Sequence, residues 1–282
     1  MLRFNQRRFC SLIAIAAVVL LMLAALDVRL TVRKYVIDAA EVTAPVRIAL
    51  ITDLHSCRYG EAQSTLIGAV RSQEPDVVLL GGDIFDDKSE NTNAEKLIAG
   101  IADQYPCYYV TGNHEHWSSE EHFAQQMDIL AEYGIPVLGG RCEKVRINGQ
   151  EILLGGVNDP SAYADTGKDE RTAMAEELDA LREMNDGQQF SILLSHRPEF
   201  FKTYLDCGFN LILCGHAHGG QWRIPGMLNG LFAPNQGLFP EYAGGMYEQD
   251  DVRMIVSRGL ARESTRVPRV FNRPELVIID VN

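Results

Sequence analysis

The chain has 282 residues, of which 46% are hydrophobic, and a formal net charge of -12. This length and hydrophobic content are enough to bury one large core or two modest ones, which excludes a fibrous or disordered protein. The negative charge argues against a general DNA- or RNA-binding protein, because such proteins neutralise phosphates with clustered Lys and Arg. We therefore expect no nucleic-acid partner.

Residues 1–29 predict a membrane anchor. Three arginines, Arg3, Arg7 and Arg8, precede an uncharged run over residues 9–26. Its 18 residues fall within the roughly 17–25 that a transmembrane helix needs and exceed the roughly 7–15 apolar residues of a secretory signal. No clean cleavage site follows the run, so an anchor is favoured over a cleaved signal. We expect a single-pass protein of the cell membrane, with the larger part of the chain outside the cytoplasm.

Beyond the anchor, short apolar runs alternate with polar stretches of helical spacing. Residues 30–45 predict a strand and a linker, and one domain is predicted over 46–282. Buried strands are predicted over 48–51, 77–80, 108–110, 152–154, 192–194, 211–213, 254–256 and 276–279. Helices are predicted over 62–71, 94–102, 120–133 and 171–184. This order predicts an α/β architecture with layered sheets, and the Gly-, Pro- and Asn-rich segment 221–246 predicts a long loop that shapes a binding site.

Five of the apolar runs lead directly into residues that can bind a metal ion. These residues are Asp53 and His55, Asp83, Asn113 beside His114, His196, and His216 with His218. In open α/β sheets, binding sites are built at the carboxyl ends of strands. Imidazole and carboxylate ligands suit Mn, Fe or Zn, and the six cysteines show no spacing typical of a structural zinc site.

Each motif alone also has a structural explanation. Asp53 could cap a helix, and Asn113 after a glycine could form a tight turn. His216 and His218 could be a buried polar pair on one face of a strand. Five of the seven histidines lie at predicted strand ends, however, and a structural explanation would need five coincidences.

Asp83 is the predicted bridge between two metal ions. Two dications about 3.5–4 Å apart can clamp a phosphoryl group and supply hydroxide near neutral pH, and a shared carboxylate holds such a pair together. Glycines at positions 82, 112 and 215 precede the ligands. They are predicted to let the backbone turn sharply just before each one.

The order of these motifs resembles that of the calcineurin-like metallophosphoesterases, whose pattern is D-x-H, G-D, G-N-H-[DE], a lone H and G-H-x-H. All five blocks occur between residues 46 and 218. The resemblance implies a four-layer sandwich of two mixed β-sheets flanked by helices. It also implies two ligand sets, which are Asp53, His55, Asp83 and His218 for one metal, and Asp83, Asn113, His196 and His216 for the other. His114 would stabilise the transition state or protonate the leaving oxygen.

The sequence GHAHGGQ over residues 215–221, together with SRGL over 257–260, is similar to a bacterial subgroup with N-terminal membrane segments. Some relatives in that subgroup act on lipid-linked or nucleotide-sugar pyrophosphates. Residues 56–58, Ser-Cys-Arg, depart from the Leu-Gly that commonly follows D-x-H in the family, which leaves the substrate preference open.

Arg258 and Asn113 are candidates to bind the substrate phosphate. Arg258 belongs to a basic stretch near the C-terminus, whose other members are Arg253, Arg262, Arg266, Arg269 and Arg273. A solvated face is the alternative explanation for this stretch, and contact with anionic head groups is another.

We therefore predict a metal-dependent hydrolase of phosphate esters with a dinuclear centre. The favoured reaction is that of a phosphodiesterase or pyrophosphatase acting on a membrane- or envelope-associated substrate, such as a lipid- or cell-wall-linked ester. A phosphomonoesterase or protein phosphatase is the alternative. A non-catalytic metal-binding protein is disfavoured because His114 stands beside a complete ligand set.

Overall fold

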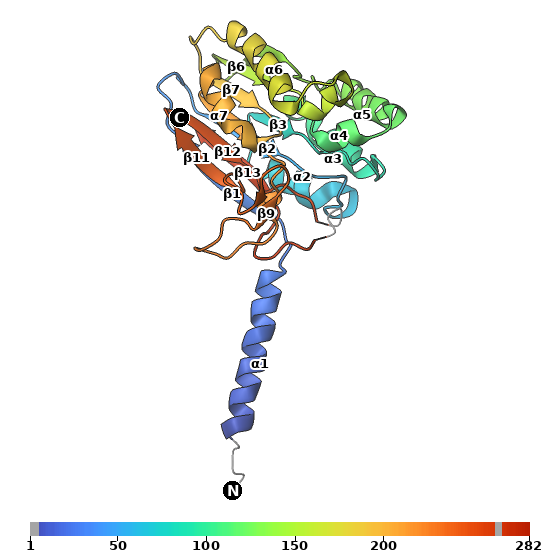
Figure 1. The fold of residues 1–282 in the computed structure, drawn as a ribbon, viewed down its shortest axis with the longest axis vertical. Coiled ribbons are helices and arrows are strands. Elements are labelled where there is room, and N and C mark those ends of the chain that lie inside the picture. Colours follow the sequence, from blue (N-terminus) through green and yellow to red (C-terminus); the bar gives the residue numbers. More distant parts are fainter. Residues whose placement is uncertain (1–5, 263–266) are drawn as a thin grey trace.

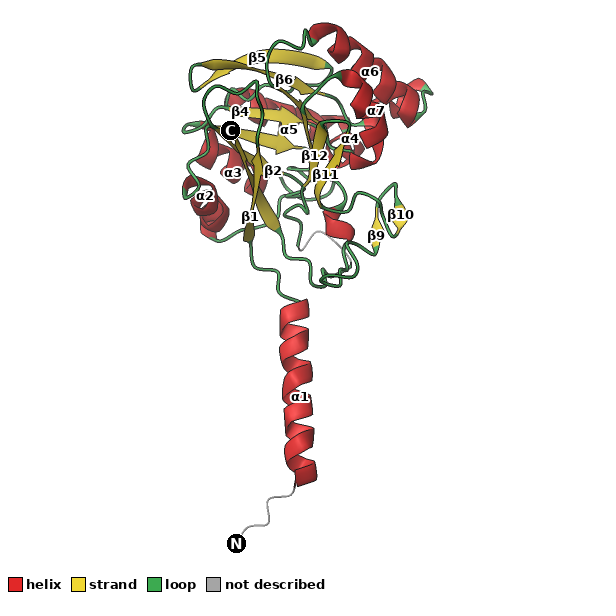
Figure 2. Ribbon diagram, turned by 90° about the vertical axis from the view of Figure 1, so that its left-hand side faces the viewer, coloured by secondary structure: helices red, strands yellow, loops and turns green. Residues whose placement is uncertain are grey.

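The computed structural model describes residues 6–262 and 267–282; Arg3 and Arg266 lie outside the described residues. Helix α1 (Gln6–Ala25) extends away from the rest of the chain (Figure 1, Figure 2). Its residues 9–24 are exposed. Within the described ranges, no helix is both long and apolar enough to cross a membrane, so the predicted membrane-spanning anchor is not supported.

Two mixed β-sheets form the centre of the molecule. The first has the order β1 (Thr31–Ile37), β13 (Glu275–Val281), β2 (Val46–Ile51), β3 (Val77–Gly81) and β4 (Cys107–Val110). The second has the order β11 (Gly245–Gln249), β12 (Val252–Val256), β8 (Leu211–Cys214), β7 (Ser191–Leu194), β6 (Gln150–Gly156) and β5 (Arg141–Ile147). A small hairpin pairs β9 (Phe232–Ala233) with β10 (Gly237–Leu238). All eight strands predicted for the domain are confirmed.

Parallel strands dominate the centre of each sheet. Strands β2, β3 and β4 are mutually parallel in the first sheet, and β6, β7, β8 and β12 in the second. Parallel neighbours place their carboxyl ends at the same edge of a sheet. The segments that follow these strands therefore gather together.

Alternation along each strand separates the core into layers. In β2, Ile48 and Leu50 pack between the two sheets, where they belong to the same cluster as Leu213 of β8. Ala49 and Ile51 point the other way and pack beneath helices. This period of two is what a strand buried on both faces requires.

Helices cover the outer face of each sheet. Apolar side chains of α2 (Ser64–Arg71), α3 (Thr92–Ala102) and α5 (Glu120–Glu132) pack on the first sheet. Those of α6 (Glu170–Met184) and α7 (Phe201–Tyr204) pack on the second. The predicted four-layer sandwich of two mixed sheets flanked by helices is thus confirmed (Figure 1).

The first and last strands of the domain lie side by side. Strand β1 pairs in parallel with β13, from Thr31 opposite Glu275 to Ile37 opposite Val281. Strand β13 in turn pairs antiparallel with β2. Residues 31–37 are therefore the edge strand of the first sheet, whereas the predicted domain boundary at residue 46 stays a prediction.

The inter-sheet core supplies a test of this layering. Leu79 of β3 is fully buried between the sheets. Leu79→Ala should lower the free energy of unfolding by about 2–5 kcal/mol, because the substitution leaves a cavity that the sheets cannot close. Val32→Ala on the edge strand, where the side chain is 37% exposed, is the control and should change it by less than about 1 kcal/mol. Urea unfolding measures both, and equal losses would contradict the layering.

Candidate metal centre

The predicted metal ligands follow the carboxyl ends of strands from both sheets. Strand β2 leads into Asp53 and His55, β3 into Asp83, β4 into Asn113, β7 into His196, and β8 into His216 and His218. Asn113 is also the first residue of the short helix α4 (Asn113–Trp117). Each of the seven side chains belongs to a residue that is at most 8% exposed.

Much of the ligand backbone is in the left-handed region. Five of the seven ligands have a φ between 47° and 65°, namely Asp53, His55, Asp83, His216 and His218. A non-glycine residue held in this region costs of order 1–3 kcal/mol, and such residues cluster at functional sites. The strain points to a requirement other than stability.

The charged and imidazole ligands form two adjacent groups. In each group, one possible ligand atom from every residue lies within 4.8 Å of the others; the groups are Asp53, His55 and His218, and Asp83, His196 and His216. The Oδ2 atom of Asp83 lies 3.1 Å from Nε2 of His196 and 3.6 Å from Nε2 of His55. Asp83 therefore reaches both groups, as a bridging carboxylate must.

Several buried atoms of the predicted ligands have no hydrogen-bond partner within the described residues. They are Oδ2 of Asp53, Oδ2 of Asp83, both ring nitrogens of His55, Oδ1 of Asn113 and Nδ1 of His218. A buried polar atom without a partner costs about 1–3 kcal/mol. Each of these atoms can donate an electron pair to a cation. The residues present therefore fit transition-metal ions.

Burial and mutual charge shift the titration of the cluster. Burial alone would lower the pKa of His196, but the charges of Asp83 and Asp53 raise it to about 10. Burial likewise opposes ionisation of Asp83, yet the neighbouring imidazoles hold its pKa well below its usual range. Burial, aided by nearby cations, puts the pKa values of His216 and His218 well below the usual range. Asp83, His216 and His218 are thus in the forms that bind metals, whereas His196 has to release a proton when it binds one.

Two of the glycines before the ligands are required for different reasons. Gly82 has a φ of +88°, as the predicted sharp turn requires, and a Cβ there would lie 2.6 Å from Nδ1 of His196. Gly112 has a φ of -106°, which any residue can adopt. The sharp turn predicted at Gly112 is therefore wrong. Glycine is required there because a Cβ would overlap the carboxylate of Asp83.

His114 lies at the edge of the cluster. Its side chain is 23% exposed, and its ring centroid lies 4.3 Å from that of His55 in an edge-on arrangement. Its Nδ1 lies 2.8 Å from Oδ1 of Asp87, and its backbone N–H donates to Oδ1 of Asp83. Asp87 thus fixes the ring and leaves Nε2 available to a substrate atom.

Glu115 is a buried residue whose role the sequence motifs do not reveal. Its carboxylate accepts hydrogen bonds from the backbone N–H groups of Asp83, Phe85 and Gly112, at 3.0, 3.1 and 2.7 Å. The hydroxyl of Tyr109 donates to it at 2.6 Å. Burial and the charge of Asp83 raise the pKa of Glu115 to about 7. Through these hydrogen bonds, Glu115 links the segment after β3 to the segment after β4.

Asp86 and Asp87 are further acids that the motifs do not single out. Oδ2 of Asp86 lies 3.4 Å from Nδ1 of His55, which leaves Nε2 of that ring facing Asp83. Carboxylates commonly orient ligand histidines in this way. Their position could have indicated a role at the site, because the two acids come three and four residues after Asp83.

Arg258 lies outside both ligand groups. Its guanidinium forms an ion pair with Glu275 at 2.5 Å. No hydrogen bond or ion pair within the described ranges joins its side chain to a predicted metal ligand. Its contact with substrate stays a prediction.

The family model for calcineurin-like phosphoesterases matches residues 46–220, which is more than half of the chain. The chain belongs to the calcineurin-like phosphoesterase family. The predicted membership of the calcineurin-like metallophosphoesterases is thus confirmed. The matched range includes every predicted metal ligand.

Relatives differ in how much of their length the chain spans. Phosphodiesterase YaeI of Escherichia coli is 28% identical over 242 residues, which cover 84% of this chain and 83% of YaeI. YpbG of Bacillus subtilis is 27% identical, over 83% of this chain and 80% of that protein. A metallophosphoesterase of Helicobacter pylori is 29% identical over 181 residues, so the chain spans only 45% of that longer protein.

Two solved structures share the fold at low sequence identity. TT1561 of Thermus thermophilus has a TM-score of 0.51 and 14% identity, and the match covers 77% of this chain and 91% of that one. The NAD nucleotidase of Haemophilus influenzae also has a TM-score of 0.51, with 16% identity over 78% of this chain and 46% of that one. At these identities the likeness shows the fold alone.

Asp83→Asn tests the bridging position. The amide is a neutral and poorer bridge between two cations, so the variant should lose at least half of its bound metal and nearly all turnover. Asp87→Asn, a neighbouring acid outside the two ligand groups, is the control and should keep its metal. Elemental analysis of both proteins after loading with Mn gives the metal content. Normal metal content and turnover in Asp83→Asn would refute the bridge.

Proposed function

We propose that this chain is a phosphodiesterase or pyrophosphatase with a dinuclear metal centre. The observation that carries the proposal is the place of Asp83, whose Oδ2 lies close to histidines of both ligand groups. One metal would be held by Asp53, His55, Asp83 and His218, and the other by Asp83, Asn113, His196 and His216. Such ions supply the positive charge that polarises a phosphoryl group.

The residues around the ligands would act on the leaving group. His114 is the part-exposed imidazole nearest to the cluster, and its Nε2 would donate a proton to the leaving oxygen. Asp87 would hold the ring in that orientation through the bond to Nδ1. Asn113, with its unpaired Oδ1, would position the substrate as well as bind metal.

A preference for diesters is supported by similarity to YaeI, which is named a phosphodiesterase and aligns over most of both chains. The first assay compares an aryl phosphodiester with its monoester, using the full chain loaded with Mn. Faster turnover of the diester is expected. Monoester preference would favour the phosphatase alternative, and no turnover of either ester would leave a narrow pyrophosphatase as the next hypothesis.

His114→Gln should lower turnover of the diester by about 10²–10⁴-fold while metal content is unchanged, because only proton transfer is removed. His122→Gln is the matched control, since that ring bonds Asn91 and lies outside the ligand groups. Rate and metal content are measured on the same samples. Wild-type turnover in His114→Gln would exclude the proposed role.

We also propose that α1 attaches the chain to a membrane, which would present lipid- or envelope-linked esters as substrates. The support is the exposed apolar surface of α1, where Leu12, Leu20 and Leu23 are 65%, 66% and 66% exposed. A helix that is apolar on all sides is stable in an apolar environment rather than in water. The catalytic domain would then lie at the outer face of the membrane.

Leu20→Glu should lower the fraction of full-length protein that floats with phosphatidylcholine vesicles by more than about tenfold, because a charge replaces a side chain worth about 1.5–3 kcal/mol on burial. Met184→Glu is the control, since Met184 is 49% exposed at the end of α6, away from α1. Equal flotation of the two variants would contradict attachment through α1.

A further inference from the structure

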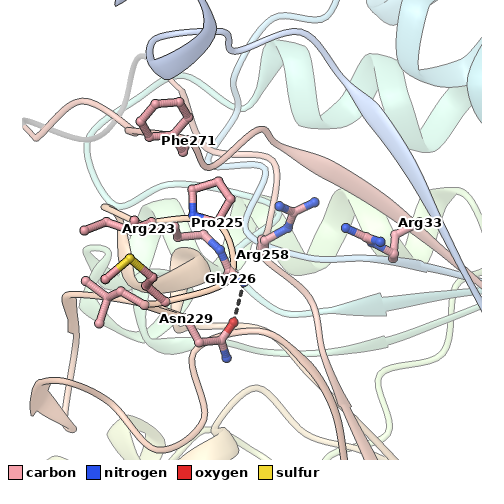
Figure 3. Close-up of a pocket in the computed structure, with 10 residues that line it drawn as sticks. Arg33, Arg223, Pro225, Gly226, Asn229, Arg258 and Phe271 are labelled. Atoms are coloured by element: carbon pink, nitrogen blue, oxygen red, sulfur yellow. Dashed lines mark hydrogen bonds between the residues drawn. The ribbon is translucent and has the colours of Figure 1, made fainter. Parts of the chain in front are cut away.

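A cavity of about 510 Å³ lies outside the metal centre, and three arginines line it. Arg33 comes from β1, Arg223 from the long loop and Arg258 from the segment after β12. Figure 3 shows the guanidinium groups of Arg33 and Arg258 turned toward one another across the cavity. Three positions far apart in the sequence thus place cationic groups around one space.

The charge of this cavity is strongly positive in a chain whose net charge is -12. None of its lining residues is acidic. Glu275, which does not line the cavity, neutralises Arg258 through an ion pair at 2.5 Å. Arg223 bonds the side-chain oxygen of Asn229, a neutral partner, and Arg33 has no ion pair within the described residues. Two positive charges therefore remain without a carboxylate.

The arginines repel one another in the absence of an anion. Burial and the charge of Arg258 lower the pKa of Arg223 below its ordinary value. An anion placed between the guanidinium groups removes this repulsion and accepts hydrogen bonds from them. Phosphate suits the geometry, because its oxygens accept paired N–H donors from a planar guanidinium.

The cavity lies at the junction of α1 with the catalytic domain. Phe271, one of its lining residues, donates its backbone N–H to the carbonyl of Ala25, the last residue of α1, at 2.7 Å. Arg273 also contacts this junction, because its guanidinium donates to the carbonyls of Arg29 and Leu30. The end of α1 and the arginine cavity are thus fixed relative to one another.

Apolar side chains project from the same loop that lines the cavity. Met227 and Ile224 line it and are 85% and 49% exposed. Nearby in the sequence, Leu238 and Phe239 are 66% and 68% exposed. Exposed apolar groups beside a basic pocket are the combination that a membrane interface favours, with apolar tips among the lipid and cations at the head groups.

We propose that the arginine cavity binds the phosphate of an anionic phospholipid head group at the membrane surface that α1 enters. The assignment rests on the proposed attachment of α1 to a membrane. The occupant is a lipid rather than free phosphate because the cavity adjoins the end of α1 and the exposed tips of Met227 and Ile224. Binding there orients the catalytic domain on the bilayer and is separate from turnover.

The test measures partition of the metal-loaded full chain onto vesicles of phosphatidylcholine, with and without phosphatidylglycerol. Arg33→Gln and Arg223→Gln should each weaken binding to the phosphatidylglycerol vesicles about fivefold, which corresponds to ~1 kcal/mol per basic residue near an anionic surface. Binding to phosphatidylcholine alone and hydrolysis of a soluble ester should not change.

Two control variants separate the cavity from general surface charge. Arg29→Gln removes an arginine close to the end of α1 but outside the cavity, and Arg146→Gln removes an exposed one on β5. Both should bind phosphatidylglycerol vesicles more tightly than Arg33→Gln. A loss in Arg29→Gln equal to that in Arg33→Gln would overturn the cavity site in favour of diffuse attraction.

The remaining outcomes distinguish this proposal from membrane attachment itself. If wild-type protein binds both vesicle types equally, and Arg33→Gln does the same, attachment stands and the head-group site is overturned. If wild-type protein binds neither type, attachment and the lipid assignment both fall. Inorganic phosphate then serves as the probe for a soluble ligand, since a larger rise in Tm for wild type than for Arg33→Gln would assign the cavity to free phosphate and not to lipid.

Discussion

Asp83 is held by hydrogen bonds to the segment that follows β4, and the other predicted metal ligands lie around its carboxylate. Its backbone N–H donates to Glu115, and its Oδ1 accepts the backbone N–H of His114. Oδ2 is left between His196 and His55, without a hydrogen-bond partner in the described residues. One oxygen thus anchors the side chain while the other is kept for a ligand, and burial strengthens both effects by lowering the local dielectric.

The central strands and the ligands could be predicted from the sequence for a common physical reason. Strands β2, β3, β7 and β8 are buried on both faces, so each appears as an uninterrupted apolar run. An Asp or His directly after such a run is easily recognised in the sequence, because polar residues are rare in an apolar core. Composition alone does not predict the four layers. That prediction depended on the order of the motifs and their resemblance to a family.

Features that depend on contacts between distant segments could not be predicted in the same way. The bond between Glu115 and Asp83 joins residues 32 positions apart, and only the fold brings them together. Edge strand β5 was missed because most of its side chains are exposed or half-buried, which removes the apolar signal. Arg258 was grouped with the basic tail, whereas β1 and the long loop supply its cationic neighbours.

The place of β13 between β1 and β2 makes the first sheet depend on segments far apart in the sequence. Strand β13 is made after β1 and β2 and pairs with both, so the first sheet stays incomplete until residues 275–281 are in place. The segment that carries Asp53 also depends on a distant part of the chain, because the backbone N–H of Leu260 donates to the carbonyls of Thr52 and Asp53. A chain without β13 would expose the edge of β2, where another chain could pair with it. Loss of residues 275–281 should therefore give an aggregation-prone product, because it removes the strand that joins β1 to β2.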